Sequence, residues 1–248
     1  MSFIKSIVKS IFVKLGFEFK RIQKLDQYEL KFDLSMKGAL LRCVQRGLKV
    51  NSVIDIGASN GSWSDICLKY IPNASYLLIE AQEAHKESLQ IFKNNHNNVN
   101  YIISAAGSYE GEIYFDNSGL FGGLASETPF EENCIRVPVI TIDSEVKKNN
   151  LKPPYLIKLD THGYELPILI GAKETIKNAS LIILEAYNFK LTNDSLKYYE
   201  ICAYMESIGF QSIEMVDTML RMYDHTLWQM DIFFIPMNSK EFSFNSYV

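Results

Sequence analysis

The stretch VIDIGASNGSWS, Val53 to Ser64, decides the fold of this chain of 248 residues. Its first part is a short apolar run, which is typical of a buried strand, and it leads into a polar turn. Gly57 permits a tight turn, and Gly61 opens a helix that is expected over 62–69. The N–H groups at the start of that helix, with the positive end of its dipole, favour a polar or anionic ligand. The sequence therefore predicts a ligand site directly after the first strand.

Outward from this turn, short apolar runs alternate with helical patterns. Strands are expected over 53–56, 76–80, 99–103, 155–160, 181–186, 210–216 and 230–236, and helices over 62–69, 83–93, 166–176 and 195–208. Single helices between strands imply right-handed crossovers and a parallel sheet. The last two runs have no helix between them, so they are expected to pair antiparallel at one edge. Near-continuous apolar runs indicate a sheet that is covered on both faces.

Composition supports one main folded domain. With 47% hydrophobic and 22% charged residues, the chain suits a single sizeable core, expected over 51–240 and preceded by a helical extension over 1–50. The net charge of -4 argues against a broad nucleic-acid surface. The cysteines are spread without a CxxC pair, which favours reduced thiols in a cytoplasmic protein over disulfides or a zinc site. They are Cys43, Cys67, Cys134 and Cys202.

The first twenty-one residues combine basic charge with apolar residues at helical spacing. The apolar positions are Ile4, Ile7, Val8, Ile11, Phe12 and Leu15. No apolar run reaches the ~20 residues that a bilayer span requires, and lysines interrupt the pattern of a signal peptide. Two interpretations remain. The segment packs on the domain or on a second copy as a homodimer contact, which we favour, or it lies peripherally on the inner face of the membrane.

The glycine turn discriminates between nucleotide-type ligands. A P-loop requires Gly-Lys-Ser or Gly-Lys-Thr, and the turn contains no lysine. The dinucleotide fingerprint would need glycines at Ser59 and Ser62 in addition to Gly57, so two of its three glycines are absent. The methionine tail of S-adenosylmethionine (SAM) requires a less close backbone approach than a pyrophosphate. The turn therefore fits SAM better than NAD.

Two further strand ends support a nucleoside ligand. Glu80 closes the second strand, 23 residues after Gly57, where an acid that binds ribose is expected. Such a carboxylate accepts charge-assisted hydrogen bonds worth about 1.5–3 kcal/mol each. The alternative is that Glu80 only favours the entry of the following helix. The third strand ends in small residues that leave space for a flat base, whose edge Ser104 would hydrogen-bond, with Ala105 beside it.

Six blocks of the sequence, from DIGASNG at 55–61 to WQMDIFF at 228–234, resemble in order those of the FkbM family of SAM-dependent methyltransferases. The most specific block is IKLDTHGYELPILIGA at 157–172. The resemblance and the strand pattern imply an α/β, Rossmann-like class I methyltransferase with a seven-stranded, mostly parallel sheet, helices on both faces and an antiparallel closing strand. It also implies methylation of a hydroxyl oxygen, with a saccharide or glycan precursor of polysaccharide biosynthesis as the favoured acceptor. The residues expected to contact SAM are Asp55, Gly57, Ala58, Ser59, Gly61, Glu80, Ser104 and Ala105.

The family block places candidate catalytic residues after the fourth strand. Asp160 is expected to face the transferring methyl group, and His162 stands where the family often has glutamate or glutamine. His162 is a candidate base for the acceptor hydroxyl, or it only hydrogen-bonds its loop. Glu165 either binds substrate or favours the start of the next helix. No metal is expected, although Asp160, Glu185 and Asn188 form an alternative set of ligands if the fold draws them together.

Several features remain open at this point. The glycine-rich stretch 117–133 is a lid or a passive connector, and Asp143 is expected to cap a short helix after 140. Tyr187, Phe189 and Trp228 line an acceptor pocket or belong to the core, and His85, His96 and His225 are expected at the surface or in loops. Two functional alternatives also remain: an NAD(P)-dependent oxidoreductase, and a binding protein that kept the methyltransferase fold without its reaction.

Overall fold

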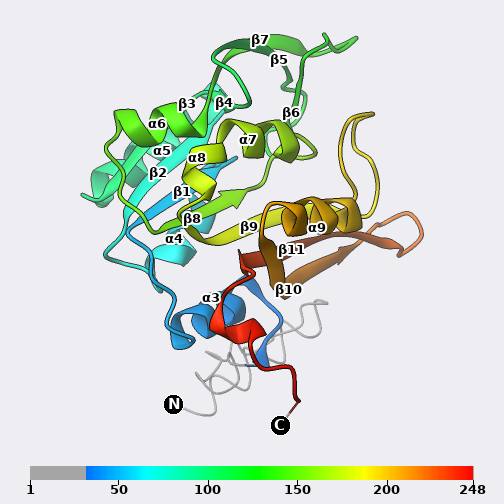
Figure 1. The fold of residues 1–248 in the computed structure, drawn as a ribbon. Helices are drawn as coiled ribbons and strands as arrows, with labels where there is room; N and C mark the ends of the chain where they lie inside the picture. Colours follow the sequence, from blue (N-terminus) through cyan, green and yellow to red (C-terminus); the bar gives the residue numbers. More distant parts are fainter. Residues whose placement is uncertain (1–31, 248) are drawn as a thin grey trace, which may run out of the picture.

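The structure is a computed structural model that describes residues 32–247 (Figure 1). The predicted amphipathic helix at the start of the chain, with its membrane or subunit contact, lies outside the described residues. Among the helices in 32–247, none is both long enough and apolar enough to cross a bilayer.

A seven-stranded sheet forms the centre of the molecule. In spatial order its strands are β10 (Phe210–Leu220), β11 (Leu227–Pro236), β9 (Ala179–Tyr187), β8 (Tyr155–Leu159), β1 (Ser52–Ile56), β2 (Ser75–Glu80) and β3 (Val99–Ile103). The strands from β9 to β3 pair in parallel, whereas β11 runs antiparallel to both of its neighbours. This confirms the predicted sheet and its antiparallel closing strand.

Helices cover both faces of this sheet, as predicted (Figure 1). One face packs against α3 (Met36–Gln45), α4 (Ser62–Leu68) and α5 (Lys86–Asn95), the last preceded by the short turn η1 (Glu83–His85). The other face packs against α6 (Ile142–Lys148), α7 (Glu165–Gly171), α8 (Lys173–Ile176) and α9 (Tyr198–Ser207). A final turn, η2 (Lys240–Phe242), follows β11. Because side chains alternate along a strand, Val53 and Ile54 enter opposite cores.

The helix predicted over 166–176 is interrupted and forms α7 and α8. The N-terminus of α8 is capped from outside, because the Asp143 carboxylate accepts from the backbone N–H groups of Glu174 and Thr175 at 2.9 and 2.8 Å. The prediction that Asp143 caps its own helix is therefore wrong. Thr141 occupies the N-cap of α6 instead. Asp143 links two neighbouring helices on the same face of the sheet.

The segment between β3 and β8 contains a second sheet, which the sequence pattern did not predict. Its strands are, in order, β4 (Ala105–Ala106), β7 (Cys134–Ile140), β5 (Gly111–Asp116) and β6 (Leu124–Ser126). These strands are short and largely exposed, and β5 buries only Ile113 and Phe115. Their pattern is therefore too weak to stand out from a loop. The sheet lies at the top of the molecule in Figure 1, beyond β3.

Helix α3 belongs to the segment 1–50, and its Leu40 is fully buried in the core beneath the main sheet. Its outer side is tied to β10 by ion pairs, because Arg42 and Arg46 both donate to the Glu214 carboxylate at 2.8 Å. Burial raises the pKa of Glu214, but hydrogen bonds from the two arginines outweigh burial and leave the pKa below its ordinary value. The ion pairs therefore stabilise the folded state as long as Glu214 is ionised.

We expect the substitution Glu214→Gln to lower the free energy of unfolding at neutral pH by about 1–3 kcal/mol, because charge-assisted bonds to both arginines are lost. The folded-state pKa of Glu214 is lowered, so its contribution is complete above the ordinary value of 4.5 and disappears as the pH falls below it. Urea unfolding at pH 7 and pH 4 checks this. The variant should lose less stability on acidification than the wild type.

As a control, Asp65→Asn removes an exposed ion pair with Lys69 and should cost no more than about 1 kcal/mol. An equal loss of free energy of unfolding in Glu214→Gln and Asp65→Asn would contradict the stabilising role of the Glu214 ion pairs.

Candidate active site

A cavity of about 370 Å³ lies where β1, β2, β8 and β9 end at their carboxyl sides. In a parallel α/β sheet this is the edge at which ligands bind. Its lining includes most of the predicted positions: Gly57, Ser59, Glu80, Ser104, Ala105, Asp160 and His162. The second sheet contributes Phe115 and Ala125, so the segment that sequence reasoning treated as irregular forms part of the wall.

Gly57 brings the glycine turn into contact with the end of β8. Its φ is +75°, and a Cβ at this position would lie 1.9 Å from the carbonyl oxygen of Asp160. The backbone N–H groups of Gly57 and Ala58 both donate to the carbonyl of Ile79, at 2.9 and 3.1 Å. The turn is thus clamped between β2 and β8, and only glycine fits at its closest point.

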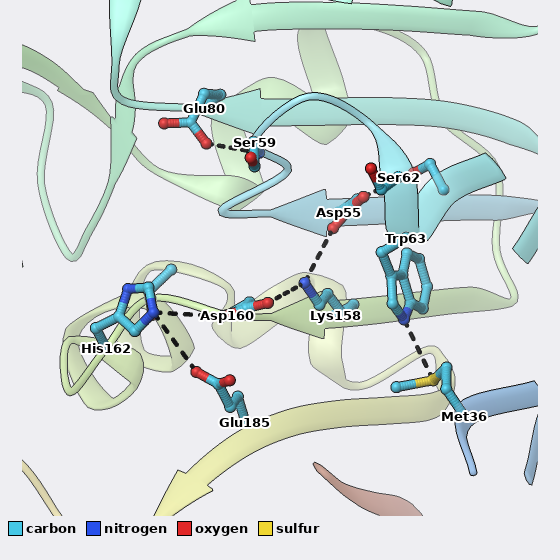
Figure 2. Close-up of polar contacts among 12 residues, drawn as sticks. Met36, Asp55, Ser59, Ser62, Trp63, Glu80, Lys158, Asp160, His162 and Glu185 are labelled. Carbon is cyan, nitrogen blue, oxygen red and sulfur yellow. Dashed lines mark hydrogen bonds and ion pairs between the residues drawn. The ribbon is translucent and has the colours of Figure 1, made fainter. Parts of the chain in front are cut away.

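Glu80 connects this turn to the second strand (Figure 2). Its two carboxylate oxygens accept from the backbone N–H groups of Ser59 and Gln82, at 2.7 and 2.8 Å. The side chain is almost completely buried yet lines the cavity. Each carboxylate oxygen has a second lone pair, so Glu80 retains acceptor capacity for ligand hydroxyls while it fixes the turn.

Two hydroxyl groups in the cavity wall are buried and have no hydrogen-bond partner among residues 32–247. They are the Oγ of Ser59 and the phenol of Tyr164. Buried polar groups are rarely left without a partner, so such atoms in a cavity wall fit a polar ligand. Burial raises the pKa of Tyr164 to about 12, which keeps its hydroxyl protonated and able to donate. The lining therefore fits a nucleoside such as SAM.

Three of the residues predicted to contact SAM do not line the cavity. They are Asp55, Ala58 and Gly61, which support the glycine turn from the protein interior. Asp55 is completely buried, and its carboxylate accepts from Ser64 Oγ at 2.7 Å and lies 3.7 Å from the Lys158 ammonium. Ala58 is buried, and Gly61 forms the N-cap of α4. Their predicted contacts with SAM stay predictions, and the carboxylate of Asp55 is turned toward Ser64 and Lys158.

The end of the third strand lines the cavity as predicted, through Ser104 and Ala105. However, the Ser104 hydroxyl lies 2.9 Å from the carbonyl oxygens of Ala105 and Pro138. Its single hydrogen is therefore used within the protein. The predicted hydrogen bond between Ser104 and the edge of a base stays a prediction, and the space beside these small residues is present.

Lys158 is a buried cation that the sequence interpretation did not include. Its ammonium donates to Asp160 Oδ2 at 2.7 Å and lies 3.7 Å from Asp55 (Figure 2). Burial lowers the pKa of Lys158, but Asp160, Asp55 and Asp231 outweigh burial and raise the pKa above its ordinary value. The same lysine lowers the pKa of Asp160 against the opposite effect of burial. A lone lysine in the apolar strand YLIKL is the signal that could have identified it, because a buried charge requires a partner.

Asp160, His162 and Glu185 converge on one point of the cavity (Figure 2). The Nε2 of His162 lies 3.8 Å from Asp160 and 3.7 Å from Glu185, and its backbone φ of 53° turns the imidazole toward both carboxylates. Burial, followed by the negative charge of Asp160, raises the pKa of Glu185 above its ordinary value. Tyr187 and Gln229 both donate to Glu185 and fix its orientation.

Glu165 and Asn188 lie outside this group. The Glu165 carboxylate is buried and accepts from Gly163 N–H at 2.8 Å and Thr161 Oγ1 at 3.2 Å, so it holds the loop after β8 in place. The catalytic or substrate-binding role of Glu165 stays a prediction, and its contacts in the structure are those of a residue that positions the loop. Asn188 donates to the carbonyl of Leu227 at 3.3 Å, and His162 takes the place that the sequence alternative gave to this amide.

The stretch 117–123 is held over the cavity by two residues that follow Glu80. Gln82 Nε2 lies 3.1 Å from the carbonyl oxygens of Gly119 and Leu120, and His85 Nε2 lies 2.7 Å from the latter. His85 is buried and lines the cavity, so its predicted surface position is wrong. The sequence pattern does not predict the contact between His85 and Leu120, which lie 35 positions apart.

The remaining aromatic and histidine residues lie beside the cavity. Tyr187 is buried, and its ring packs edge-on against Trp228, which in turn contacts Phe189, at centroid distances of 5.7 and 5.5 Å. This favours the core alternative for Tyr187, whereas Phe189 and Trp228 are only partly buried. His96 packs against a neighbouring ring of α5, and His225 is exposed, as expected.

The strand order, the antiparallel β11 and the cavity beside the glycine turn define a Rossmann-like class I methyltransferase. The chain belongs to the methyltransferase FkbM domain family, whose model matches residues 55–212. Its methyl donor is S-adenosylmethionine. The comparison thus confirms the family, fold and cofactor that the sequence predicts, and it contradicts the oxidoreductase alternative.

Solved structures with a similar arrangement share little sequence with this chain. Precorrin-6y C5,15-methyltransferase from Geobacter metallireducens is 15% identical over 88% of this chain and 93% of its own, with a TM-score of 0.43. A SAM-dependent methyltransferase from Aquifex aeolicus is 12% identical over 86% and 100%, with a TM-score of 0.43. Magnesium protoporphyrin IX methyltransferase from Synechocystis, with bound SAM, is 13% identical over 94% and 96%, with a TM-score of 0.44. No curated protein matches the sequence significantly.

Proposed function

We propose that this enzyme transfers the methyl group of SAM to a hydroxyl oxygen, with a saccharide or glycan precursor as acceptor. The observation that carries the proposal is the position of Asp160, His162 and Glu185 in the same cavity as the glycine turn and Glu80. A hydroxyl is a weak nucleophile until its proton is removed, and these three residues surround one point with groups that attract or accept a proton.

The residues divide into two roles. Ser59 and Glu80 bind the cofactor, with Ser59 Oγ free to bond its amino-acid end and Glu80 able to accept from its ribose hydroxyls. The bound sulfonium supplies an electrophilic methyl group. Asp160, His162 and Glu185, which line the same cavity, orient the acceptor hydroxyl and attract its proton.

The acceptor proposal has support in the chemistry of the wall. Polar side chains of His162, Glu185 and Gln229 meet apolar side chains such as Phe115 and Met219 in the same cavity. Sugars present hydroxyl groups at their edges and apolar C–H faces, so a wall of this mixed type suits them. The test is transfer of a labelled methyl group to a panel of saccharides and nucleotide sugars, followed by location of the label on oxygen or nitrogen. Label on nitrogen or carbon would refute O-methylation, and S-adenosylhomocysteine binding without transfer to any acceptor would favour the non-catalytic alternative.

We expect His162→Ala to reduce turnover by about 10²-fold, because the group nearest to the acceptor proton is removed. The dissociation constant for S-adenosylhomocysteine should change by less than about threefold, since His162 lies across the cavity from the cofactor turn. Initial rates and isothermal titration measure the two quantities. His225→Ala, at an exposed position, is the matched control and should retain wild-type turnover. Equal turnover in the wild type and His162→Ala would remove this residue from the reaction.

A further inference from the structure

The cluster at the ends of β8 and β9 has the geometry of a cation site. One donor atom each from Asp160, His162 and Glu185 lies within 4.8 Å of the others, and His162 Nε2 is 3.8 and 3.7 Å from the two carboxylates. These separations exceed hydrogen-bond lengths. The point equidistant from the three donor atoms therefore lies no more than about 2.4 Å from each of them. This distance is within the range of ligand distances around divalent cations.

Groups outside the cluster orient its two carboxylates. Lys158 holds Asp160 through Oδ2, which leaves Oδ1 directed toward His162. Tyr187 and Gln229 each donate to Glu185, from the same strand and from β11. Carboxylates that bind metals are usually held by outer hydrogen bonds of this kind, because such bonds fix the direction of the free lone pairs.

The charges on this face of the sheet are unbalanced. Asp55 pairs in register with Lys158, and Asp231 pairs with Glu185, so these side chains share one face with Asp160 beside them. Within residues 32–247, Lys158 is the one buried lysine or arginine that faces these four acids. One fully buried and three partly buried carboxylates in this excess favour a bound cation, because like charges at short distance raise the energy of the ionised state.

We propose that Asp160, His162 and Glu185 bind a divalent cation of the Mg²⁺ or Mn²⁺ type, and that this cation holds two neighbouring oxygen atoms of the acceptor. The inference rests on the proposed function and narrows its substrate class to acceptors that chelate, such as vicinal diols or α-hydroxy acids. Three protein ligands leave positions open in an octahedral shell for a pair of acceptor oxygens. Oxygen and imidazole donors together suit cations of this class.

A cation at this point would activate the acceptor without a separate base. The acceptor O–H bond breaks because the cation lowers the pKa of the hydroxyl that binds it, and the proton passes to solvent water. The oxygen lone pair then forms the new C–O bond to the methyl carbon. The C–S bond breaks, its electron pair returns to sulfur, and the products are a methyl ether, S-adenosylhomocysteine and one proton.

The test uses the full chain, stripped with a chelator, and measures Mn²⁺ binding by calorimetry with and without S-adenosylhomocysteine. We expect one Mn²⁺ per chain in the wild type, and a Mn²⁺ affinity reduced at least about tenfold in Glu185→Gln. Glu80→Gln is the matched control in the same cavity: its Mn²⁺ affinity should equal that of the wild type while its S-adenosylhomocysteine affinity falls. His162→Gln, on a loop, is the second ligand variant should Glu185→Gln fail to fold.

The two proposals fail separately in this experiment. Equal Mn²⁺ affinity in the wild type and both ligand variants, or no Mn²⁺ binding at millimolar concentration, would overturn the cation site and leave O-methyl transfer intact. Label on nitrogen or carbon would overturn the O-methyl transfer on which the acceptor role rests, whether or not Mn²⁺ binds. With an accepted saccharide, methyl transfer should cease after chelation and return with Mg²⁺ or Mn²⁺. Full activity after chelation would also overturn the cation site.

Discussion

Asp160→Asn should reduce methyl transfer by about 10²–10⁴-fold, the largest kinetic effect expected in this enzyme. The substitution keeps the size of the side chain but removes the negative charge that faces His162 and Lys158. In the proposed O-methyl transfer, the acceptor hydroxyl would then lose the charge that attracts its proton, whichever group receives it. Initial rates at saturating SAM measure the effect, and the dissociation constant for S-adenosylhomocysteine should stay within about threefold of the wild type.

The control for this prediction must separate catalysis from stability, because Asp160→Asn also leaves Lys158 less well paired. Asp143→Asn serves this purpose. It weakens the cap of α8, should cost about 1 kcal/mol of stability, and lies away from the cavity lining. Turnover should remain at the wild-type level in Asp143→Asn. A similar fall of turnover in both variants would mean that the effect of Asp160→Asn comes from loss of folded protein.

Glu80→Ala should weaken S-adenosylhomocysteine binding by about 10²-fold or more, the largest effect expected on affinity. Two contributions combine. The acceptor for the ribose hydroxyls disappears, and so do the bonds that hold the backbone of Ser59 and Gln82 in place. A loss of about 3 kcal/mol, typical of charge-assisted hydrogen bonds, corresponds to this factor. Titration calorimetry measures the change directly.

Two further variants make the Glu80 result specific. Glu80→Gln keeps one carbonyl acceptor and the shape of the side chain, so its affinity should fall between those of the wild type and Glu80→Ala. Glu83→Gln alters an exposed neighbour whose ion pair with Lys86 lies at the surface, and its affinity should not change. Undiminished binding by Glu80→Ala would reject the ribose assignment.

The sequence predicts the main sheet because its strands are buried on both faces and read as continuous apolar runs. The second sheet is missed for the opposite reason: β5 exposes most of its side chains and carries no comparable run. The helix over 166–176 is predicted as one although Gly171 stands where α7 ends. The start of α8 is capped by Asp143, which lies in the neighbouring helix α6 and is remote in sequence.

Among site residues, sequence position identifies the strand end but not the direction of the side chain. Asp55 and Glu80 both terminate or nearly terminate apolar strands, yet only Glu80 reaches the cavity. The Asp55 carboxylate instead contacts Ser64 of α4 and Lys158 of β8. Both contacts depend on the tertiary structure and cannot be read from the sequence. The sequence offers Glu185 only in an alternative set of metal ligands. Its proximity to Asp160 follows from the pairing of β8 with β9, because the two residues are remote in sequence.

Gly57, in the turn assigned to the methyl donor, packs so closely against the carbonyl of Asp160 that no Cβ fits between them. The donor-binding turn and the backbone of Asp160 therefore form one close-packed joint. A shift of the turn toward the donor must displace the backbone that carries the acceptor-facing acid. For the proposed acceptor site, variation is therefore expected to cost least at Phe115 and Ala125, which line the cavity from the second sheet. Engineering of new acceptors should begin with those positions and leave the backbone around the joint unaltered.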